Sequence, residues 1–544
     1  MVTRAPKSQT IRAMAWSGKR RFPGVVVVAA WLAAACAPVH PPAPADVVSP
    51  PFTQQDQQVP ERPEAEVFAA GYASITEKYI EAVPAATLAM EGMRGLGAID
   101  PALTVRRTED VVVLAVSERT IARFPAPADD DVEGWAALTA KVSAAGRRTS
   151  KELRTASDEK LYEAVFDGVL SSLDIFSRYA GAEEARRNRE KRDGFDGIGI
   201  RVRMEAGAAR VTWVLADTPA AGAGLRKGDR ITHVDGVSVR DFKSHDVVRR
   251  LRGPTHSRVA LTVRREGVAG PLAFEMERRH IVLPTVTERR DRGIIFLTVT
   301  SFNQGTASSV AAKLTKALDG MGASPKGLVL DLRGNPGGLL KQSIEVADLF
   351  LTQGQIVRTH GRHPDSEQRY EADGEDMVHG LPLVVLVDGK SASAAEIIAA
   401  ALQDHGRAVV IGTTSFGKGT VQTVIRLPND GEITLTWSRL ITPSGYVLHG
   451  LGVMPDICTS GAAGNVGKLI ATVFGRKVKI AAARARWQTA GLGEEKKRRD
   501  LRATCPAERR RKALEIEVAR RLLSDRALYG RALDLTAATS QAQY

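Results

Sequence analysis

Residues 382–396 read PLVVLVDGKSASAAE, an unbroken apolar run followed by a serine-rich turn and the alanine-rich start of a helix. The run Pro382–Val387 has the length of a buried strand, and the apolar spacing from Ala392 to His405 predicts a helix. A strand, a turn and a helix in this order form the repeating unit of an α/β sheet. The stretch therefore predicts an α/β domain with a serine at the start of a helix.

The same alternation extends on both sides of this stretch, from Ile294 to about Ile457. The expected strands are 294–297, 327–332, 382–387, 409–411 and 419–427, and the expected helices are 307–318, 339–351 and 392–405. Apolar strands that alternate with helices indicate a sheet buried on both faces. Active sites in such sheets lie where the strands end, so the turns after the strands are the places to look for chemistry.

Three of these turns concentrate unusual residues: 331–338 (DLRGNPGG), 388–396 and 412–422 (GTTSFGKGTVQ). Glycines directly before a helix offer free backbone N–H donors, which an oxyanion hole requires. Ser393 lies at a helix start, where a serine most often only caps the helix, but small alanines flank it and the helix dipole favours a developing anion. Lys418 acts as a general base if burial lowers its pKa, and the alternative is a solvated loop lysine.

Other catalytic classes have little support. Residues 412–419 approach a phosphate-binding loop, but Gly419 stands where that loop needs a hydroxyl for Mg²⁺, and a strand follows instead of a helix. The sequence lacks the G-x-S-x-G elbow of Ser-His-Asp hydrolases, and its ten histidines have no metal-ligand spacing. We therefore expect neither a metal nor a cofactor.

The segment 196–268 has a different texture, with short β-type runs and frequent turn signals. It begins with Gly197-Ile198-Gly199-Ile200 and continues through TPAA (218–221), KGD (227–229) and ITHVDG (231–236). Successive backbone N–H groups at a glycine turn suit a peptide carboxylate, and an edge strand after the turn can accept the peptide as an added strand. The segment resembles a PDZ domain, and the alternative is a small β-domain with an ordinary glycine turn. The amides of Ile198, Gly199 and Ile200 are the expected carboxylate binders.

Taken together, these motifs resemble the carboxyl-terminal processing peptidases, or tail-specific proteases, from about Leu173 to Asp456. The order of the PDZ-like and catalytic segments and the trailing run GLGVMPD (450–456) belong to the resemblance. The family's nucleophile is the second serine of a Ser-Ala-Ser-Ala-Ser-Glu run, which falls on Ser393. Ala395 replaces the third serine of that run, and Glu396 matches its glutamate.

The resemblance also implies a fold and a mechanism. The family's base falls on Lys418 and its orienting glutamine on Gln422, and the catalytic core is of the crotonase/ClpP-like α/β type. The implied mechanism is a Ser-Lys dyad that forms an acyl-enzyme, with the backbone N–H groups of Ala394 and Gly337 as the oxyanion hole. The implied substrates are proteins with apolar C-terminal tails. A catalytically inactive peptide-binding scaffold is the alternative, and the sequence leaves an adaptor and an oligomer open.

The N-terminus has the features of an export signal. Lys19, Arg20 and Arg21 precede the apolar run Val25–Ala35, and Cys36 follows it. Three outcomes stay open, namely lipidation of Cys36, cleavage near Ala35 and an uncleaved anchor. Each predicts a protein that is exported to the periplasm or cell envelope, where Cys458 and Cys505 could pair.

The resulting division is a signal segment (1–36), a proline-rich linker (37–63) and a mainly helical N-terminal domain (64–195) without expected chemistry, apart from a strand pair within 103–124. The PDZ-like domain (196–268), the catalytic domain (269–460) and a basic helical C-terminal segment (461–544) follow. The excess positive charge of the chain is concentrated in 468–531. A solvated helical face explains such a segment, and attraction to anionic lipid, cell-wall polymer or nucleic acid is the alternative. We do not expect nucleic acid as a partner, whereas membrane or cell-wall association stays open.

Overall fold

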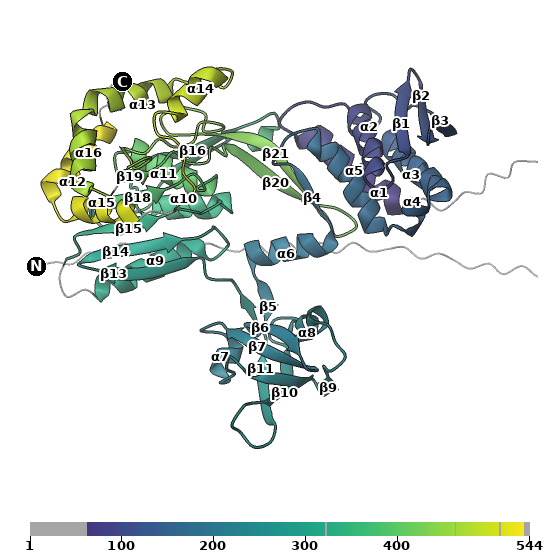
Figure 1. Ribbon diagram of the computed structural model, residues 1–544, viewed down its shortest axis with the longest axis horizontal. Coiled ribbons are helices and arrows are strands. Elements are labelled where there is room, and N and C mark those ends of the chain that lie inside the picture. Colours follow the sequence, from purple (N-terminus) through teal and green to yellow (C-terminus); the bar gives the residue numbers. More distant parts are fainter. Residues whose placement is uncertain (1–62, 321–323, 463, 511–512, 538–544) are drawn as a thin grey trace, which may run out of the picture. The chain divides into compact units, whose positions relative to one another are not determined.

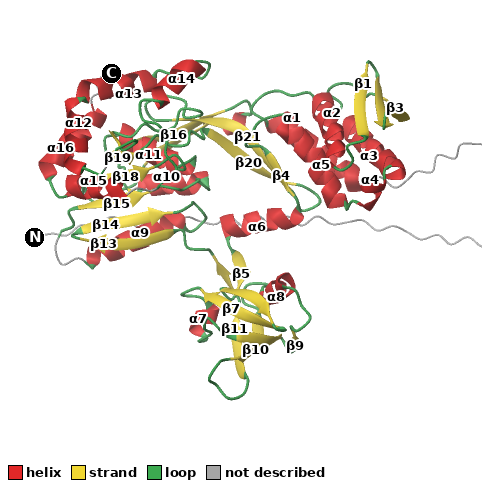
Figure 2. Cartoon of the chain, in the orientation of Figure 1, coloured by secondary structure: helices red, strands yellow, loops and turns green. Residues whose placement is uncertain are grey.

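The computed structural model describes residues 63–320, 324–462, 464–510 and 513–537 (Figure 1). The predicted signal segment with Cys36 and nearly all of the linker lie outside these residues. Figure 2 shows that the described chain combines helices with several separate sheets, in agreement with the multidomain α/β class.

The catalytic domain is built on a six-stranded sheet in the order β13-β14-β15-β18-β19-β22. The edge strand β13 is antiparallel to β14, and the remaining strands are parallel. The strands are β13 (Val286–Asp291), β14 (Ile294–Val299), β15 (Gly327–Asp331), β18 (Leu383–Val387), β19 (Val409–Gly412) and β22 (Ile457–Cys458). The predicted strands of this sheet are confirmed, because each apolar run that defined them is buried.

Helices cover both faces of this sheet. Alternate side chains of one strand point to opposite faces, so Leu383, Val385 and Val387 join one apolar cluster while Val384 and Leu386 join another. The first cluster contains the helices that sequence analysis predicted, which are α9 (Thr306–Asp319), α10 (Leu340–Asp348) and α11 (Ala394–Asp404).

The second cluster is covered by the C-terminal segment. Its helices are α12 (Val466–Gly475), α13 (Lys477–Gln488), α14 (Glu495–Arg502), α15 (Ala513–Leu523) and α16 (Arg526–Ala537). Val518 and Leu522 of α15 pack against the sheet, and buried Glu515 accepts a 2.5 Å hydrogen bond from Arg333 in the first catalytic turn. The segment is therefore a structural layer of the catalytic domain as well as a basic surface. Within the described ranges, no helix is both long enough and apolar enough to cross a membrane.

A second sheet, β17-β16-β21-β20, joins the catalytic domain to the N-terminal helices. Its strands are β16 (Gly354–His360), β17 (Gln368–Ala372), β20 (Thr420–Arg426) and β21 (Glu432–Ile441), and β21 also pairs with β4 (Arg178–Ala180). Ile433 and Leu435 of β21 are buried in the same cluster as the N-terminal helices. Those helices are α1 (Pro63–Lys78), α2 (Ala85–Gly95), α3 (Val132–Thr149), α4 (Lys151–Thr155) and α5 (Asp158–Ser171), with the short helix η1 (Leu96–Ala98) after α2. Another short helix, η2 (Pro364–Ser366), lies between β16 and β17.

The N-terminal domain differs from prediction in one detail. In place of a strand pair, residues 103–125 form the three-stranded antiparallel sheet β1 (Leu103–Thr108), β2 (Val111–Val116) and β3 (Arg119–Pro125). The third strand is mostly half-exposed or exposed, so its apolar signal in the sequence is weak. Helix α6 (Ala182–Asp193) then leads to the PDZ segment.

The PDZ segment is a small sheet in the order β11-β10-β8-β7-β6, with β9 (Val237–Ser238) paired to β8. Its other strands are β6 (Ile200–Glu205), β7 (Ala208–Val214), β8 (Arg230–Val234), β10 (Arg258–Arg264) and β11 (Leu272–Glu277), and its helices are α7 (Pro219–Gly222) and α8 (Ser244–Leu251). The short strands β5 (Phe195–Gly197) and β12 (Arg279–Ile281) pair with each other, so the segment leaves and rejoins the chain at one place. Strand β6 is an edge strand, as peptide addition requires.

Candidate active site

Ser393 lies in a strained turn between β18 and α11. Its φ of 54° and ψ of −116° fall in a region that residues with a side chain rarely adopt, so the surrounding contacts must hold it there. Asp388 supplies part of that hold, because its Oδ1 accepts the N–H groups of Lys390 at 2.9 Å and of Gly334 at 2.9 Å. The contact with Gly334 also ties the serine turn to the glycine turn after β15.

Lys418 lies in the loop between β19 and β20, among glycines that the backbone needs. Gly417 has a φ of 89°, and a Cβ on Gly419 would lie 1.9 Å from the backbone nitrogen of His449. Burial lowers the pKa of Lys418, the nearby Arg178 lowers it further, and Asp174 and Glu396 oppose this change. The lysine is therefore shifted towards the neutral form that a general base requires.

A single buried carboxylate connects the two loops. Glu396, in the first turn of α11, accepts the N–H of Ser393 at 2.8 Å, that of Gly417 at 2.6 Å and that of Lys418 at 2.9 Å. The Ser415 hydroxyl donates to it as well. Burial raises the pKa of Glu396, and these hydrogen bonds act against that increase. One side chain thus fixes the backbone on both sides of the candidate dyad.

These loops border a cavity of about 460 Å³ that contains most of the predicted catalytic residues. Gly337, Ser393, Ala394, Lys418 and Gln422 all line it. Among the described residues, the Ser393 hydroxyl and the Lys418 amine do not share a hydrogen bond with each other. The Gln422 amide donates to Thr420 Oγ1 at 2.9 Å and to Thr436 Oγ1 at 3.3 Å rather than to the lysine.

The glycine turn offers a different oxyanion donor from the expected one. The Gly337 N–H donates to Asn335 Oδ1 at 2.8 Å, so it is already engaged. Gly338 also lines the cavity, and in the described chain neither its N–H nor that of Ala394 forms a hydrogen bond. A Cβ on Gly338 would lie 2.1 Å from Phe302 O, so this close approach requires glycine. Of the two neighbouring glycines, Gly338 rather than the predicted Gly337 therefore has the free N–H.

The N-terminal domain contributes residues that sequence analysis missed. The Phe176 ring lies 5.1 Å from Lys418 Nζ, and its neighbours Asp174 and Arg178 are two of the three charges that act on the lysine. The available signal was a polar and aromatic run directly after α5. Its connection to the site depends on the pairing of β4 with β21, which local periodicity does not reveal.

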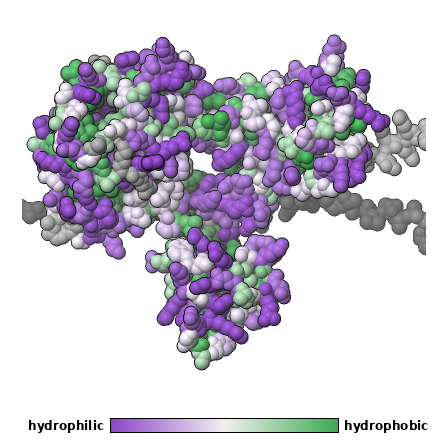
Figure 3. Space-filling view, viewed as in Figure 1, coloured by the Kyte–Doolittle hydropathy of each residue, from purple (hydrophilic) through white to green (hydrophobic). Residues whose placement is uncertain are grey.

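Helix α6 supplies one edge of the cavity through Asn188, Lys191 and Arg192. Arg192 pairs with buried Glu432 of β21 at 3.1 Å, which fixes the helix to the second sheet. Figure 3 shows the surface over this helix as strongly hydrophilic.

The candidate peptide site lies on the PDZ segment, at the edge strand β6. Gly199 has a φ of 85°, and the N–H groups of Ile198 and Gly199 form no hydrogen bond within the described chain. The loop after α7 is held by buried Asp229, which accepts Arg265 Nε at 2.7 Å and the Arg226 N–H at 2.8 Å. The three predicted amides therefore lie at the start of the edge strand β6, and two of them, those of Ile198 and Gly199, are free to donate.

Comparison with known proteins gives matches to a peptidase family and to a PDZ domain. The model of peptidase family S41 matches residues 293–459, and a PDZ domain model matches residues 210–265. The chain is 42% identical over 302 residues to a carboxy-terminal-processing protease of Bartonella bacilliformis, which covers 55% of this chain and 70% of the relative. It is 33% identical over 355 residues to the carboxy-terminal processing protease CtpB of Bacillus subtilis, which covers 63% and 72%. Among solved structures, the photosystem II D1 C-terminal processing protease aligns with 22% identity and a TM-score of 0.36, over 72% of this chain and 92% of the other.

Proposed function

The chain belongs to peptidase family S41, the carboxy-terminal processing proteases, and is a serine-type peptidase; we propose that it cleaves proteins with a Ser393–Lys418 dyad after its PDZ domain has bound their C-terminal tails. The observation that carries the proposal is the shared cavity. It joins a serine in a strained turn to a lysine with a lowered pKa, and one buried carboxylate fixes both loops. Neither a helix cap nor a solvated lysine explains that combination.

Catalysis begins when neutral Lys418 takes the proton of Ser393 Oγ. The serine then attacks the scissile carbonyl, and the protonated lysine returns the proton to the leaving amine. Water, deprotonated by the same lysine, hydrolyses the acyl-enzyme. Because the two side chains share no hydrogen bond in this structure, the first step requires them to come within hydrogen-bond distance of each other. Gln422 reaches the amine only if it exchanges its threonine partners.

The N–H groups of Ala394 and Gly338 form the oxyanion hole in this mechanism. Both belong to residues that line the cavity and lack a hydrogen bond in the described chain, whereas the Gly337 N–H is engaged by Asn335. Ala394 is also the first residue of α11, where the helix dipole favours negative charge.

The PDZ domain selects the substrate by its tail. The free N–H groups of Ile198 and Gly199 would bind the terminal carboxylate, and the peptide would extend the sheet along β6. Apolar side chains of a tail would find apolar partners there, because partly buried Ile200 and Val202 of β6 pack against the apolar cluster of the domain.

The test is cleavage of an unfolded protein with an apolar C-terminal tail by the full chain. Ser393→Ala and Lys418→Ala should each abolish cleavage while the protein stays folded. Lys390→Ala is a matched control, because this exposed lysine lies in the serine turn and does not line the cavity. Cleavage that persists in either dyad variant refutes the assignment, and binding without cleavage by the unmodified chain identifies a scaffold.

We also propose that the protein works outside the cytoplasm. The apolar run Val25–Ala35 after three basic residues supports export, and the pairing of Cys458 with Cys505 suits an oxidising compartment. Incorporation of a labelled fatty acid that is lost in Cys36→Ser would establish the lipid anchor. Recovery of the protein in the cytoplasmic fraction alone would contradict the proposal.

A further inference from the structure

The two catalytic loops are held from outside the cavity by one short segment of the C-terminal region, Arg502–Glu508, which we call the strap. It begins at the last residue of α14 and leads towards α15, beyond the residues that the family model matches. In the serine turn, the Gly389 N–H donates to Glu508 O at 2.7 Å. A backbone contact of the strap therefore supports the turn that carries Ser393.

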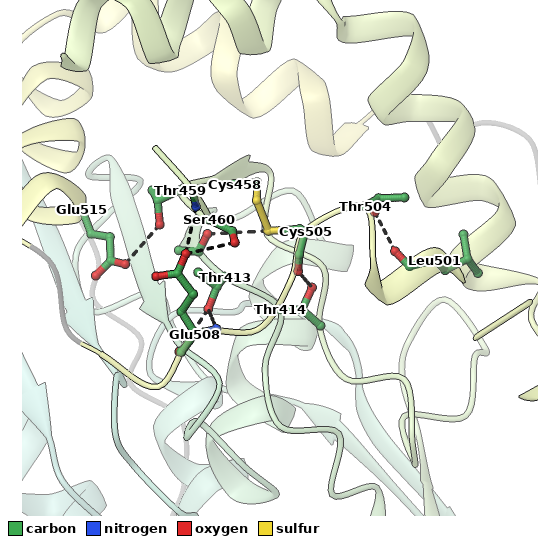
Figure 4. Close-up of a disulfide and its surroundings, with 12 residues drawn as sticks. Thr413, Thr414, Cys458, Thr459, Ser460, Leu501, Thr504, Cys505, Glu508 and Glu515 are labelled. Carbon is green, nitrogen blue, oxygen red and sulfur yellow. Dashed lines mark hydrogen bonds between the residues drawn. A yellow bond between two sulfur atoms is a disulfide. The ribbon is translucent and has the colours of Figure 1, made fainter. Parts of the chain in front are cut away.

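The strap supports the lysine loop as well. Thr414 Oγ1 donates to Cys505 O at 2.6 Å, and the Glu508 N–H donates to Thr413 Oγ1 at 3.1 Å (Figure 4). Arg502 Nη2 donates to Ser415 O at 3.0 Å. Ser415 in turn donates to Glu396, the carboxylate that holds both loops. The strap thus reaches each loop directly and the dyad only through them.

Covalent and polar contacts fix the strap itself. Cys505 forms a disulfide with Cys458 at the end of β22, as Figure 4 shows. The Glu508 carboxylate accepts the Ser460 hydroxyl at 3.0 Å and the Gly461 N–H at 2.8 Å. The disulfide anchor is the last residue of β22 and the polar anchor follows that strand directly, so the strap is attached to the rigid part of the domain.

We propose that the strap is a positioning element for Ser393 and Lys418, and that the Cys458–Cys505 disulfide keeps it in place. The proposal rests on the proposed function of that dyad. No strap residue lines the cavity, so its loss should lower kcat and leave KM for a given substrate unchanged. Loosening the lysine loop should also admit water to Lys418 and lessen the desolvation that lowers its pKa.

Thr414→Val removes the hydroxyl that binds Cys505 O and keeps the shape of the side chain. We expect kcat to fall about fivefold, the effect of one lost neutral hydrogen bond, with the acidic limb of the kcat–pH profile moved to higher pH. Thr504→Val is the matched control, because this exposed threonine of the strap donates only to Leu501 O. An unchanged kcat and pH limb in folded Thr414→Val would overturn the proposal.

The disulfide is tested in the full chain with a dithiol reductant, which reduces Cys458–Cys505 to two thiols and is itself oxidised to a cyclic disulfide. The reductant should lower kcat and shift the same limb in the unmodified chain. It should have no further effect on Cys458→Ala/Cys505→Ala, because this variant lacks the disulfide and should already show the lower kcat and the shifted limb. A reduced unmodified chain that keeps its kcat and pH limb would count against the anchoring role.

Amide hydrogen exchange separates this proposal from the proposed function, because it needs no substrate. Exchange in residues 388–393 and 413–418 should speed up in Thr414→Val and not in Thr504→Val. If the unmodified chain cleaves nothing but these loops loosen as expected, the dyad assignment fails and the strap stands. Unaltered exchange in an active enzyme overturns the strap alone.

A second, independent observation concerns the outer surface of α13. No acidic residue occurs between Asp456 and Glu494, a stretch with six basic residues. Arg484 is buried and pairs with Asp456, whereas the others are exposed and have no carboxylate within 4.0 Å in the described chain. These five are Lys468, Arg476, Lys477, Lys479 and Arg486.

The same helix exposes apolar side chains among these cations. Val478 has 82% of its surface exposed, and Ala482 and Ala485 follow it at helical spacing on the solvent side. We infer that this face of α13, formed by residues 477–479, 482, 485 and 486, binds the surface of an anionic lipid membrane. The cations meet the headgroups by charge attraction, and Val478 is the exposed apolar side chain among them that reaches the interface.

Sedimentation of the full chain with vesicles tests this surface. Binding to vesicles of phosphatidylethanolamine and phosphatidylglycerol should weaken about thirtyfold in Lys477→Gln/Lys479→Gln, as expected for two cations removed from an anionic surface. Arg148→Gln/Lys151→Gln, two exposed cations of the N-terminal domain, should leave binding unchanged. Equal loss in both pairs indicates net charge only. If Lys477→Gln/Lys479→Gln loses binding to duplex DNA or teichoic acid but still binds vesicles, the face binds a polymer instead. Each of these two results overturns the inference.

Discussion

The catalytic sheet and the PDZ sheet differ in how many of their faces are covered by helices and in whether an edge strand stays accessible. Strands β15 and β18 are buried at every position, because helices cover both faces of the catalytic sheet. Strand β10 of the PDZ sheet alternates between buried and more exposed residues. Among the described residues, the PDZ segment has one large apolar cluster, whereas the catalytic sheet has one on each face. The first sheet provides a rigid base for reacting groups, and the second keeps the edge strand β6 available for a peptide.

The two regions also stabilise their functional loops in different ways. Glu396 in the catalytic domain is held by neutral donors from both loops, without a direct cation partner among its hydrogen bonds. Asp229 in the PDZ domain pairs with Arg265, a guanidinium that is only partly buried. The catalytic loops therefore depend on a network that fails as a unit, whereas the PDZ loop depends on one ion pair.

The largest effect should follow from Glu396→Gln. The new amide would present N–H groups to donors that now bind a carboxylate, so both catalytic loops lose their common support. We expect kcat to fall about a hundredfold or more, since hydrogen bonds to a charged group are among the strongest. Steady-state cleavage of a tail-bearing substrate measures this, with exposed Glu371→Gln as the control. A kcat near that of the control would show that the network does not position the dyad.

Arg265→Met should act on the PDZ domain alone. It leaves Asp229 buried without its cation, which costs about 3 kcal/mol in the free energy of unfolding of that domain. Cleavage of tail-bearing proteins should weaken through KM, while short peptides without a tail are cleaved as before. An equal loss of activity towards both substrate classes would contradict an effect confined to the PDZ domain.

The same ion pair predicts an acid-sensitive PDZ domain. Burial alone would raise the pKa of Asp229, but the hydrogen bonds from Arg265 and Arg226 outweigh it and the pKa is lowered. A carboxylate with a lowered pKa adds stability above its unfolded pKa of about 4, and this stability is lost as the pH falls through the folded value. Unfolding free energies of the unmodified chain and of Asp229→Asn, measured from neutral to acidic pH, should therefore converge at the acidic end. A constant difference would contradict this origin.

Gly199→Ala should have a smaller effect at the peptide site. A residue with a side chain is strained at a φ of 85°, and the new Cβ would lie 2.5 Å from the Thr218 side chain. We expect KM for tail-bearing substrates to rise about tenfold, because the turn must shift away from Thr218 and its N–H groups then no longer converge on the carboxylate. Gly236→Ala, a turn glycine of the same domain with open space around it, shares the positive φ and serves as the control for strain alone.

The smallest expected change is a shift of pH dependence in Arg178→Gln. Activity needs neutral Lys418, so it rises with pH through the pKa of that lysine. Arg178 lowers this pKa, and its removal should move the acidic limb of kcat/KM to higher pH. The effect is modest because the arginine is exposed and its charge is screened. A limb that moves to lower pH would contradict the sign of this interaction.

Much of the catalytic domain could be predicted from local sequence. Each parallel strand is an apolar run that ends at a turn of glycine, serine or aspartate, and the strands and helices occur where this pattern places them. The motifs also located the two turns after strands that carry Ser393 and Lys418. Strands β16, β17 and β21 were not predicted, because their residues alternate in burial or lie among polar neighbours and give no continuous apolar run.

The sequence by itself determined the order of the domains, the buried sheet and the residue types at the site. Only the tertiary structure decided that Phe176 and Arg178 flank Lys418, that Gly338 rather than Gly337 has the free N–H, and that a C-terminal strap holds both loops. The reason is physical. The periodicity of the sequence reports which side chains one element buries. Contacts between distant segments depend instead on strand register, on backbone direction in turns and on which polar groups are hydrogen-bonded to each other.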